Sequence, residues 1–130
     1  MENVTRFIGS KRWYDRTTNT VHTGAFFNDK NKESGEISVF DIDKELQSYR
    51  EDKIFEIGDK KVYRKPPHTA ARADMKVADI NMIRTNKGNL QVIKDFWGSK
   101  HCNIRPFPSD ASALNIAMQL AKISNLKIRK

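Results

Sequence analysis

Cysteine is almost missing from this sequence, since Cys102 is the only one among 130 residues. One thiol excludes an internal disulfide and a thiolate zinc cluster, and it is compatible with the reducing cytosol. The histidines, His22, His68 and His101, fit no standard zinc spacing. We therefore predict a cytoplasmic protein with no structural metal.

Long apolar runs are also missing. No segment approaches the roughly 20 apolar residues that a membrane span needs, and charges interrupt the first 15 positions, where an export signal would lie. The GxxxxGK pattern of a phosphate-binding loop does not occur, and neither Ser38 nor Ser99 has the sequence context of a nucleophile elbow. We expect no membrane association and no cofactor.

Acidic residues are outnumbered by basic ones. Lys and Arg total 24 against 16 Asp and Glu, which gives a net charge of +8. Such a field attracts polyanions, because bound cations neutralise phosphates and release counterions. The charge favours an anionic partner, with nucleic acid ahead of an acidic protein or a lipid surface.

The length and the alternation of apolar residues predict one domain, residues 1–130, of the α+β class. Alternation or β-branched residues indicate strands over 4–10, 21–27, 37–42, 60–65, 90–97 and 101–107, with 21–27 as the hairpin partner of the first strand and 101–107 as that of 90–97.

Helical periodicity occurs in three places. The clearest begins at Ser109 or Asp110 and runs to about Ser124, with apolar residues around most of its circumference. A second helix over 44–57 would start at an Asp43 cap and stop at Gly58. Residues 76–84 favour a short helix, although 73–80 also alternates like a strand. We predict a mostly antiparallel sheet with the last helix packed across one face and a second helix near the middle of the chain.

One predicted strand carries a row of functional side chains. In a strand over 101–105, Cys102 and Ile104 face the core, while His101, Asn103 and Arg105 face the other way. An imidazole, an amide and a guanidinium in one row suit phosphate binding or proton transfer. A solvated strand face explains the same pattern.

A second cluster lies on both sides of two prolines, and it contains Arg64, Lys65, His68, Arg72 and Asp74. If His68 folded beside His101, one imidazole would deprotonate an RNA 2′-hydroxyl, the other would protonate the leaving oxygen, and Arg105 would stabilise the phosphorane. A basic surface loop is the alternative interpretation. Trp13, next to Lys11 and Arg12, would stack on a base or else close the end of the core.

These observations predict a basic nucleic-acid-binding protein with RNA favoured over DNA. The alternatives are a metal-independent endoribonuclease with His68, His101 and Arg105 as its catalytic residues, and a non-enzymatic subunit that docks on an acidic protein. The expected nucleic-acid contacts are Lys11, Arg12, Trp13, Arg64, Lys65, Arg72, Asn103, Lys127, Arg129 and Lys130.

Overall fold

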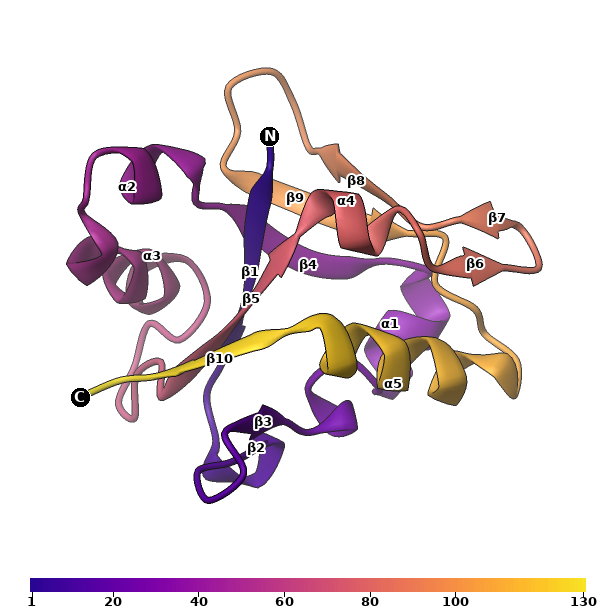
Figure 1. The fold of residues 1–130 in the computed structure, drawn as a ribbon, viewed down its shortest axis with the longest axis horizontal. Coiled ribbons are helices and arrows are strands. Elements are labelled where there is room, and N and C mark those ends of the chain that lie inside the picture. The colour runs from indigo at the N-terminus through magenta and orange to yellow at the C-terminus, as the bar shows by residue number, and fades with distance from the viewer.

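A six-stranded antiparallel sheet runs through the computed structural model, which describes residues 1–130 (Figure 1). The strand order is β10-β5-β1-β4-β9-β8. In chain order the strands are β1 (Asn3–Ile8), β4 (Ile37–Asp41), β5 (Ala71–Lys76), β8 (Gln91–Lys94), β9 (His101–Arg105) and β10 (Asn125–Ile128).

Five α-helices and two small hairpins complete the chain. The helices are α1 (Asp29–Ser34), α2 (Asp43–Gln47), α3 (Ile54–Lys61), α4 (Val77–Ile80) and α5 (Ser112–Ile123). The hairpins pair β2 (Tyr14–Asp15) with β3 (Thr20–Val21), and β6 (Arg84–Thr85) with β7 (Gly88–Asn89). The fold is α+β, as the sequence predicts. None of the helices combines the length and the apolar character needed to cross a bilayer.

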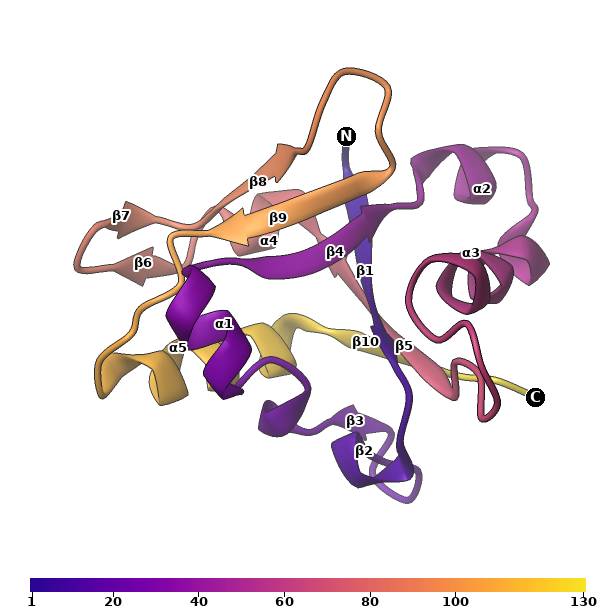
Figure 2. The same ribbon diagram turned by 180° about the vertical axis from the view of Figure 1, so that it is seen from behind.

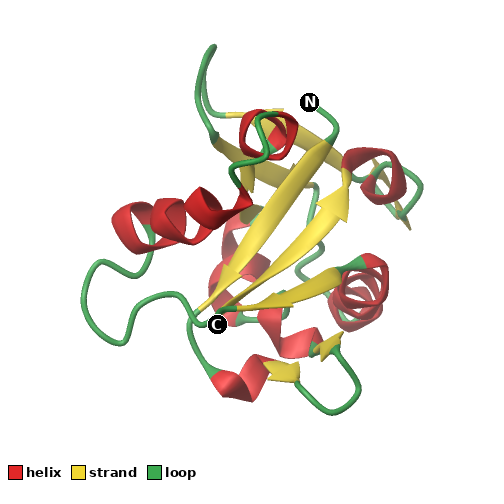
Figure 3. Cartoon of the chain, turned by 60° about the vertical axis from the view of Figure 1, so that its left-hand side comes forward, coloured by secondary structure: helices red, strands yellow, loops and turns green.

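Helices lie on both sides of the sheet (Figure 3). On one side α5 buries Ile116, Ala117 and Leu120 in the main core, which also contains Cys102 and Ile104. On the other side α3 contributes Ile54 to a smaller cluster with Phe7, Phe40 and Ile42. Each face of the sheet therefore has its own hydrophobic cluster, and the cluster on the α5 side is much the larger of the two.

The sheet opens between its two central strands. β1 pairs with β5 along six residues but with β4 at only two, Val4 with Asp41 and Thr5 with Phe40. Beyond Thr5 the two strands diverge, as Figure 2 shows from the side of α1 and α3. The sheet thus consists of two three-stranded halves, β10-β5-β1 and β4-β9-β8, that meet at a short joint.

Several sequence predictions agree with this structure. The first strand, the strand over 37–42 and the hairpin of β8 with β9 all form. α5 begins two residues after Asp110, whose carboxylate accepts the Ser112 N–H at 2.9 Å, and it ends at Ile123. Cys102 and Ile104 are fully buried on the α5 side.

The predicted strand over 21–27 is wrong. Only Thr20–Val21 forms a strand, and a 3₁₀ turn follows at Thr23–Ala25. The Nδ1 atom of His22 accepts the Gly24 N–H at 2.9 Å, which stabilises that turn. Its hairpin partner is β2, while β1 pairs with β4 and β5 instead.

The predicted helix over 44–57 is interrupted. α2 ends at Gln47, Tyr49 has a φ of 55°, and α3 begins only at Ile54. Gly58 lies inside α3 rather than after it, because its missing side chain lets the helix approach β1 closely. The Asp43 carboxylate accepts the Glu2 and Asn3 N–H groups, at 2.7 and 2.8 Å, instead of capping the helix.

Three further boundaries differ from prediction. The expected strand over 60–65 is the end of α3 and a loop. The stretch that alternates over 73–80 is strand up to Lys76 and helix from Val77, so each interpretation holds for half of it. The strand expected over 90–97 stops at Lys94.

Candidate functional site: a cationic hollow at the opening of the sheet

A hollow of about 360 Å³ lies where β1 and β4 diverge, between α1 and the end of α3. No carboxylate lines it, although the protein contains 16 acidic residues. Two lysines and an arginine supply its charge, and Phe7, Phe40, Val62 and Tyr63 are its apolar lining residues. The lining residues are Arg6, Phe7, Asn28, Lys30, Asn31, Ser38, Phe40, Lys61, Val62, Tyr63 and His101.

Arg6 fills the opening between the diverging strands. Its Nε donates to the Ala25 carbonyl at 3.0 Å, and its Nη1 donates to the Ser38 carbonyl at 2.9 Å. It forms no ion pair, and desolvation by burial lowers the pKa of its guanidinium. Arginine nevertheless stays protonated in proteins, so Arg6 brings a positive charge without a carboxylate partner to the hollow.

His101 is held in a fixed orientation at the edge of the hollow. Its Nδ1 contacts an oxygen of the Asp95 carboxylate, and its Nε2 lies 3.1 Å from Ser38 Oγ. The Phe40 ring packs edge-on against the imidazole, with the two centroids 5.2 Å apart. The residue is half-buried, so solvent reaches part of the ring.

The rest of the predicted row is also engaged by acidic groups. Asn103 donates from Nδ2 to the other oxygen of Asp95 at 2.7 Å, and Arg105 forms a 3.2 Å ion pair with Glu36. Neither side chain lines the hollow. Of the three residues in the row, His101 alone reaches the candidate site, and Asn103 acts on it through Asp95.

His68 does not join His101 in the hollow. It lies in the exposed loop between α3 and β5, with its Nδ1 2.8 Å from the Tyr63 carbonyl oxygen. Arg64 and Lys65 are exposed in the same loop. The structure therefore brings one of the two predicted histidines, and none of these loop cations, into the site.

Arg72, an expected phosphate contact, is buried and engaged. Its Nε donates to Asp74 at 3.0 Å, its Nη2 lies 3.6 Å from Glu51, and its guanidinium stacks over Phe55. Only 4% of the side chain is exposed. The contrast with Arg6 is informative, because the half-buried Arg6 on the adjacent strand has no carboxylate partner, whereas Arg72 has two.

Trp13 packs against the core, which is the structural alternative considered from the sequence. It lies in a 3₁₀ turn, Lys11–Trp13, with its ring against the backbone of Gly24 and 5.9 Å from His22. Arg12 covers its outer surface, 5.6 Å from the ring centroid. Lys11 and Arg12 remain exposed.

The basic C-terminal residues form and follow the edge strand β10, which pairs with β5. Lys127 and Lys130 are exposed. Arg129 is bound to Asp59 through two hydrogen bonds of 2.9 and 2.8 Å, and it also donates to the Thr69 carbonyl at 3.1 Å. The tail therefore offers two free cations rather than three.

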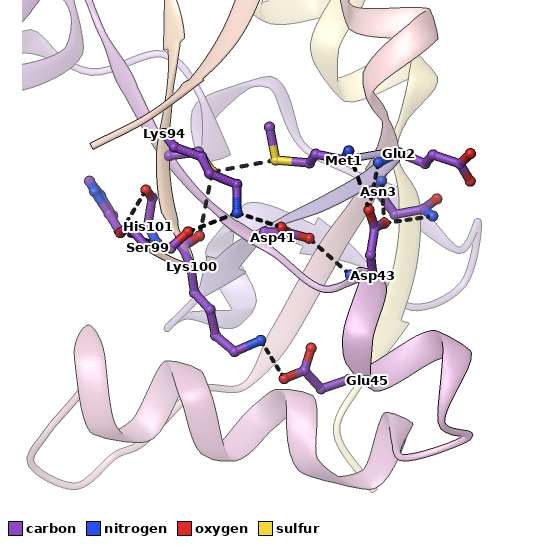
Figure 4. Close-up of polar contacts among 11 residues, drawn as sticks. Met1, Glu2, Asn3, Asp41, Asp43, Glu45, Lys94, Ser99, Lys100 and His101 are labelled. Atoms are coloured by element: carbon purple, nitrogen blue, oxygen red, sulfur yellow. Dashed lines mark hydrogen bonds and ion pairs between the residues drawn. The ribbon is translucent and has the colours of Figure 1, made fainter. Parts of the chain in front are cut away.

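A second polar cluster surrounds the start of α2 (Figure 4). Lys94 pairs with Asp41 at 2.9 Å, Lys100 pairs with Glu45 at 2.6 Å, and the Asp43 carboxylate takes the first backbone N–H groups of the chain. The three carboxylates each have a cation or N–H partner, and they join the β8–β9 connection and the N-terminus to α2.

Two exposed aromatic residues were missed from the sequence. Phe96 and Trp97 belong to the connection between β8 and β9, where 69% and 97% of their surfaces are exposed. Both residues were placed in the strand predicted over 90–97, because they follow its alternating run. The following Gly98, with a φ of 85°, was the available sign that the chain turns there.

Sequence reasoning also missed Ser38 and Asp95 as neighbours of His101. Ser38 is 63 positions from His101, and no spacing rule joins them. Alternation along β4 does put Ser38 on the same face as Phe40, which was the available signal.

Comparison with known families, curated proteins and solved structures gives no match. The residues of the hollow therefore carry the functional argument alone.

Proposed function

We propose that the protein binds single-stranded nucleic acid, with RNA favoured over DNA, and that a backbone phosphate occupies the cationic hollow. The observation that carries this proposal is Arg6, a half-buried guanidinium without any carboxylate partner. Removing part of a cation's hydration costs free energy unless an anion is nearby, and an incoming phosphate supplies that anion.

The surroundings of Arg6 support the same ligand. Lys30 and Lys61 are exposed on opposite sides of the hollow, on α1 and at the end of α3, and neither forms an ion pair. Their flexible ammonium groups are able to follow a phosphate, while the arginine stays fixed by its two carbonyl contacts. The absence of any lining carboxylate favours an anion over a cation or a neutral sugar.

The exposed aromatic pair supports a single strand in particular. Phe96 and Trp97 follow directly after Asp95, which contacts His101 at the edge of the hollow. Unpaired bases stack on exposed aromatic rings, each contributing about 1–3 kcal/mol, whereas the bases of a duplex are already stacked. A strand with one phosphate in the hollow is thus able to place further bases at this connection.

The test measures binding of a fluorescent single-stranded RNA at several salt concentrations. The double variant Lys30→Gln/Lys61→Gln should weaken binding at least tenfold and reduce the slope of log K against log salt by about 0.7 for each phosphate that is no longer neutralised. The matched control is Lys87→Gln/Lys122→Gln, which removes two exposed lysines outside the hollow. Trp97→Ala should also weaken binding, and DNA of the same sequence should compete less well than RNA.

Two results would contradict the proposal. Equal weakening by the two double variants would mean that diffuse positive charge, and not the hollow, binds the RNA. No binding of RNA or DNA even at low salt would favour the docking subunit with an acidic protein partner. The same samples, analysed for cleavage products, test the ribonuclease alternative.

A further inference from the structure

Three side chains from adjacent strands form a hydrogen-bonded series at the edge of the hollow. Asp95 follows β8, His101 begins β9, and Ser38 lies in β4. The Asp95 carboxylate contacts His101 Nδ1, and His101 Nε2 is 3.1 Å from Ser38 Oγ. Ser38 is exposed and lines the hollow, so a ligand bound there reaches its hydroxyl.

The chemistry of these groups fixes the direction of each hydrogen bond. An ionised carboxylate only accepts, so the bond to Asp95 requires the proton of the neutral imidazole to be on Nδ1. The lone pair is then on Nε2, and the Ser38 hydroxyl donates to it. This is the protonation pattern in which a histidine removes the proton of a serine nucleophile.

The imidazole is supported from several directions. The second oxygen of Asp95 accepts from Asn103 Nδ2 at 2.7 Å, and the Asp95 N–H donates to the His101 carbonyl at 3.1 Å. Phe40 packs against the ring. A base held in this way keeps both its tautomer and its distance to the nucleophile.

We propose that Ser38 is a nucleophile, activated by His101, that cleaves a carboxylic ester bearing a negatively charged group. The cations of the hollow argue for the charge on the substrate, since neither Lys30 nor Lys61 is paired with an acidic residue. Arg6 is the group that stabilises developing negative charge, because its Nη1 donates to the Ser38 carbonyl and its Nη2 has no hydrogen-bond partner in the protein.

The reaction needs no group beyond the substrate and water. Ser38 Oγ forms a bond to the carbonyl carbon while its proton moves to His101 Nε2. The bond from that carbon to the alcohol oxygen then breaks, and His101 returns the proton to the leaving alcohol. Water attacks the acyl-serine with its proton passing to His101, the acid departs, and the proton goes back to Ser38 Oγ.

A fluorophosphonate probe, which reacts with activated serines, tests the nucleophile directly on the full chain. Intact mass should show one adduct, and peptide mapping should place it on Ser38. Ser38→Ala should abolish the adduct, and His101→Ala should slow its formation at least a hundredfold. Ser48→Ala, an exposed serine at the end of α2, is the matched control and should label at the wild-type rate.

Asp95 is a positioning residue in this scheme, and a pair of variants separates that role from a structural one. Asp95→Asn should slow labelling, because an amide that donates to Nδ1 moves the proton to Nε2 and removes the acceptor for Ser38. Asp95→Glu should recover part of the rate. Both variants should keep a wild-type melting temperature, since Asp95 is exposed.

The substrate class has its own comparison. The 4-nitrophenyl ester of succinic acid, which carries a free carboxylate, should be hydrolysed at least tenfold more efficiently than 4-nitrophenyl acetate, and Lys61→Gln should reduce that preference. Three results would overturn the assignment of Ser38 as the nucleophile. They are no labelling of the folded wild-type protein, labelling at another residue, and an unchanged labelling rate in His101→Ala. Faster hydrolysis of the neutral acetate ester would overturn the proposal that the substrate is negatively charged. None of these outcomes depends on RNA binding.

Discussion

Arg6 donates a hydrogen bond from Nη1 to the carbonyl oxygen of Ser38, 2.9 Å away, at the place where β1 and β4 separate. If the two strands stayed paired, a backbone N–H of β1 would donate to that carbonyl. Because they separate, the Arg6 side chain supplies the donor instead. The same guanidinium is fixed by Ala25 from the other direction. One residue thus satisfies a backbone carbonyl at the opening of the sheet and brings positive charge to the hollow.

This double contact predicts the effect of a conservative change at Arg6. Arg6→Lys keeps the charge but loses the planar fork that reaches both carbonyls. We expect the free energy of unfolding to fall by about 1.5–3 kcal/mol, the contribution of one hydrogen bond from a charged group. Urea denaturation measures it. The control is Arg16→Lys, an exposed arginine, and an equal effect of the two changes would contradict the bridging role of Arg6.

Gly58→Ala tests the close approach of α3 to β1. In most helices this change stabilises, because glycine is about 1 kcal/mol less favourable than alanine. Here a Cβ atom would lie only 2.7 Å from the Phe7 ring and even closer to the Thr69 hydroxyl. We therefore expect a lower melting temperature, measured by circular dichroism. A higher melting temperature would show that the helix moves away from β1 at little cost.

Leu120→Asp should unfold the protein or make it insoluble, because Leu120 is fully buried on the inner face of α5. An unpaired buried carboxylate costs several kcal/mol, comparable with the stability of a small domain, about 5–15 kcal/mol. Leu114→Asp is the control on the same helix, since 49% of Leu114 is exposed. The melting temperature of that variant should change little. Similar effects at the two positions would contradict the packing of α5.

Asp41 should make the stability depend on pH in acid. Burial raises the pKa of this carboxyl, but hydrogen bonds from the Asp43 N–H and from Lys94, with the charges of Lys94 and Lys100, outweigh burial and lower it overall. A carboxyl whose pKa is lower in the folded state stabilises the fold fully at pH values above its unfolded pKa, which is about 3.9 for aspartate. This stabilisation is lost as the pH falls through the pKa of the folded state.

Denaturation of the wild type and of Asp41→Asn at a series of pH values measures this contribution. The difference in stability between them should be full at neutral pH and should shrink below about pH 4. Asp52→Asn, an exposed aspartate without an ion pair, should show no such difference. A constant gap between wild type and Asp41→Asn down to pH 2 would contradict the assignment.

Cys102 should be unreactive until the protein unfolds. The thiol is fully buried, and burial raises its pKa, so little of the reactive thiolate forms near neutral pH. Ellman's reagent should react with the native protein at a small fraction of its rate in guanidinium chloride. Fast reaction with the native protein would show that β9 is exposed by local opening.

The local sequence pattern was sufficient to predict the orientation of side chains where one face of a strand or helix is buried and the other is not. β9 alternates cleanly, and the inward direction of Cys102 and Ile104 follows from that alternation. α5 was recognised by its period, yet its exposure was misjudged: Leu114 and Met118 are about half exposed. Apolar residues around a helix do not show which of them the rest of the chain covers.

The candidate site depended on contacts that no local pattern contains. Arg6 gave no sequence signal, because its role follows from the divergence of two strands that lie far apart in the chain. Arg72, a neighbouring cation of similar local context, is bound to Asp74 and Glu51. The sequence singled out Arg72 and not Arg6, and only the fold determined which guanidinium is left without a carboxylate.

The order of the strands also has a kinetic consequence. Each half of the sheet combines segments from distant parts of the chain, and only the β8–β9 pair joins strands that are close in sequence. β1 must find β5 across about half of the chain, and β10 pairs with β5 from still further along it. Proteins dominated by such distant pairings close large loops early and fold in milliseconds to seconds, which is slow for their size. The hairpin that carries Asp95 and His101 is thus the one piece of the sheet able to form before the chain has collapsed around it.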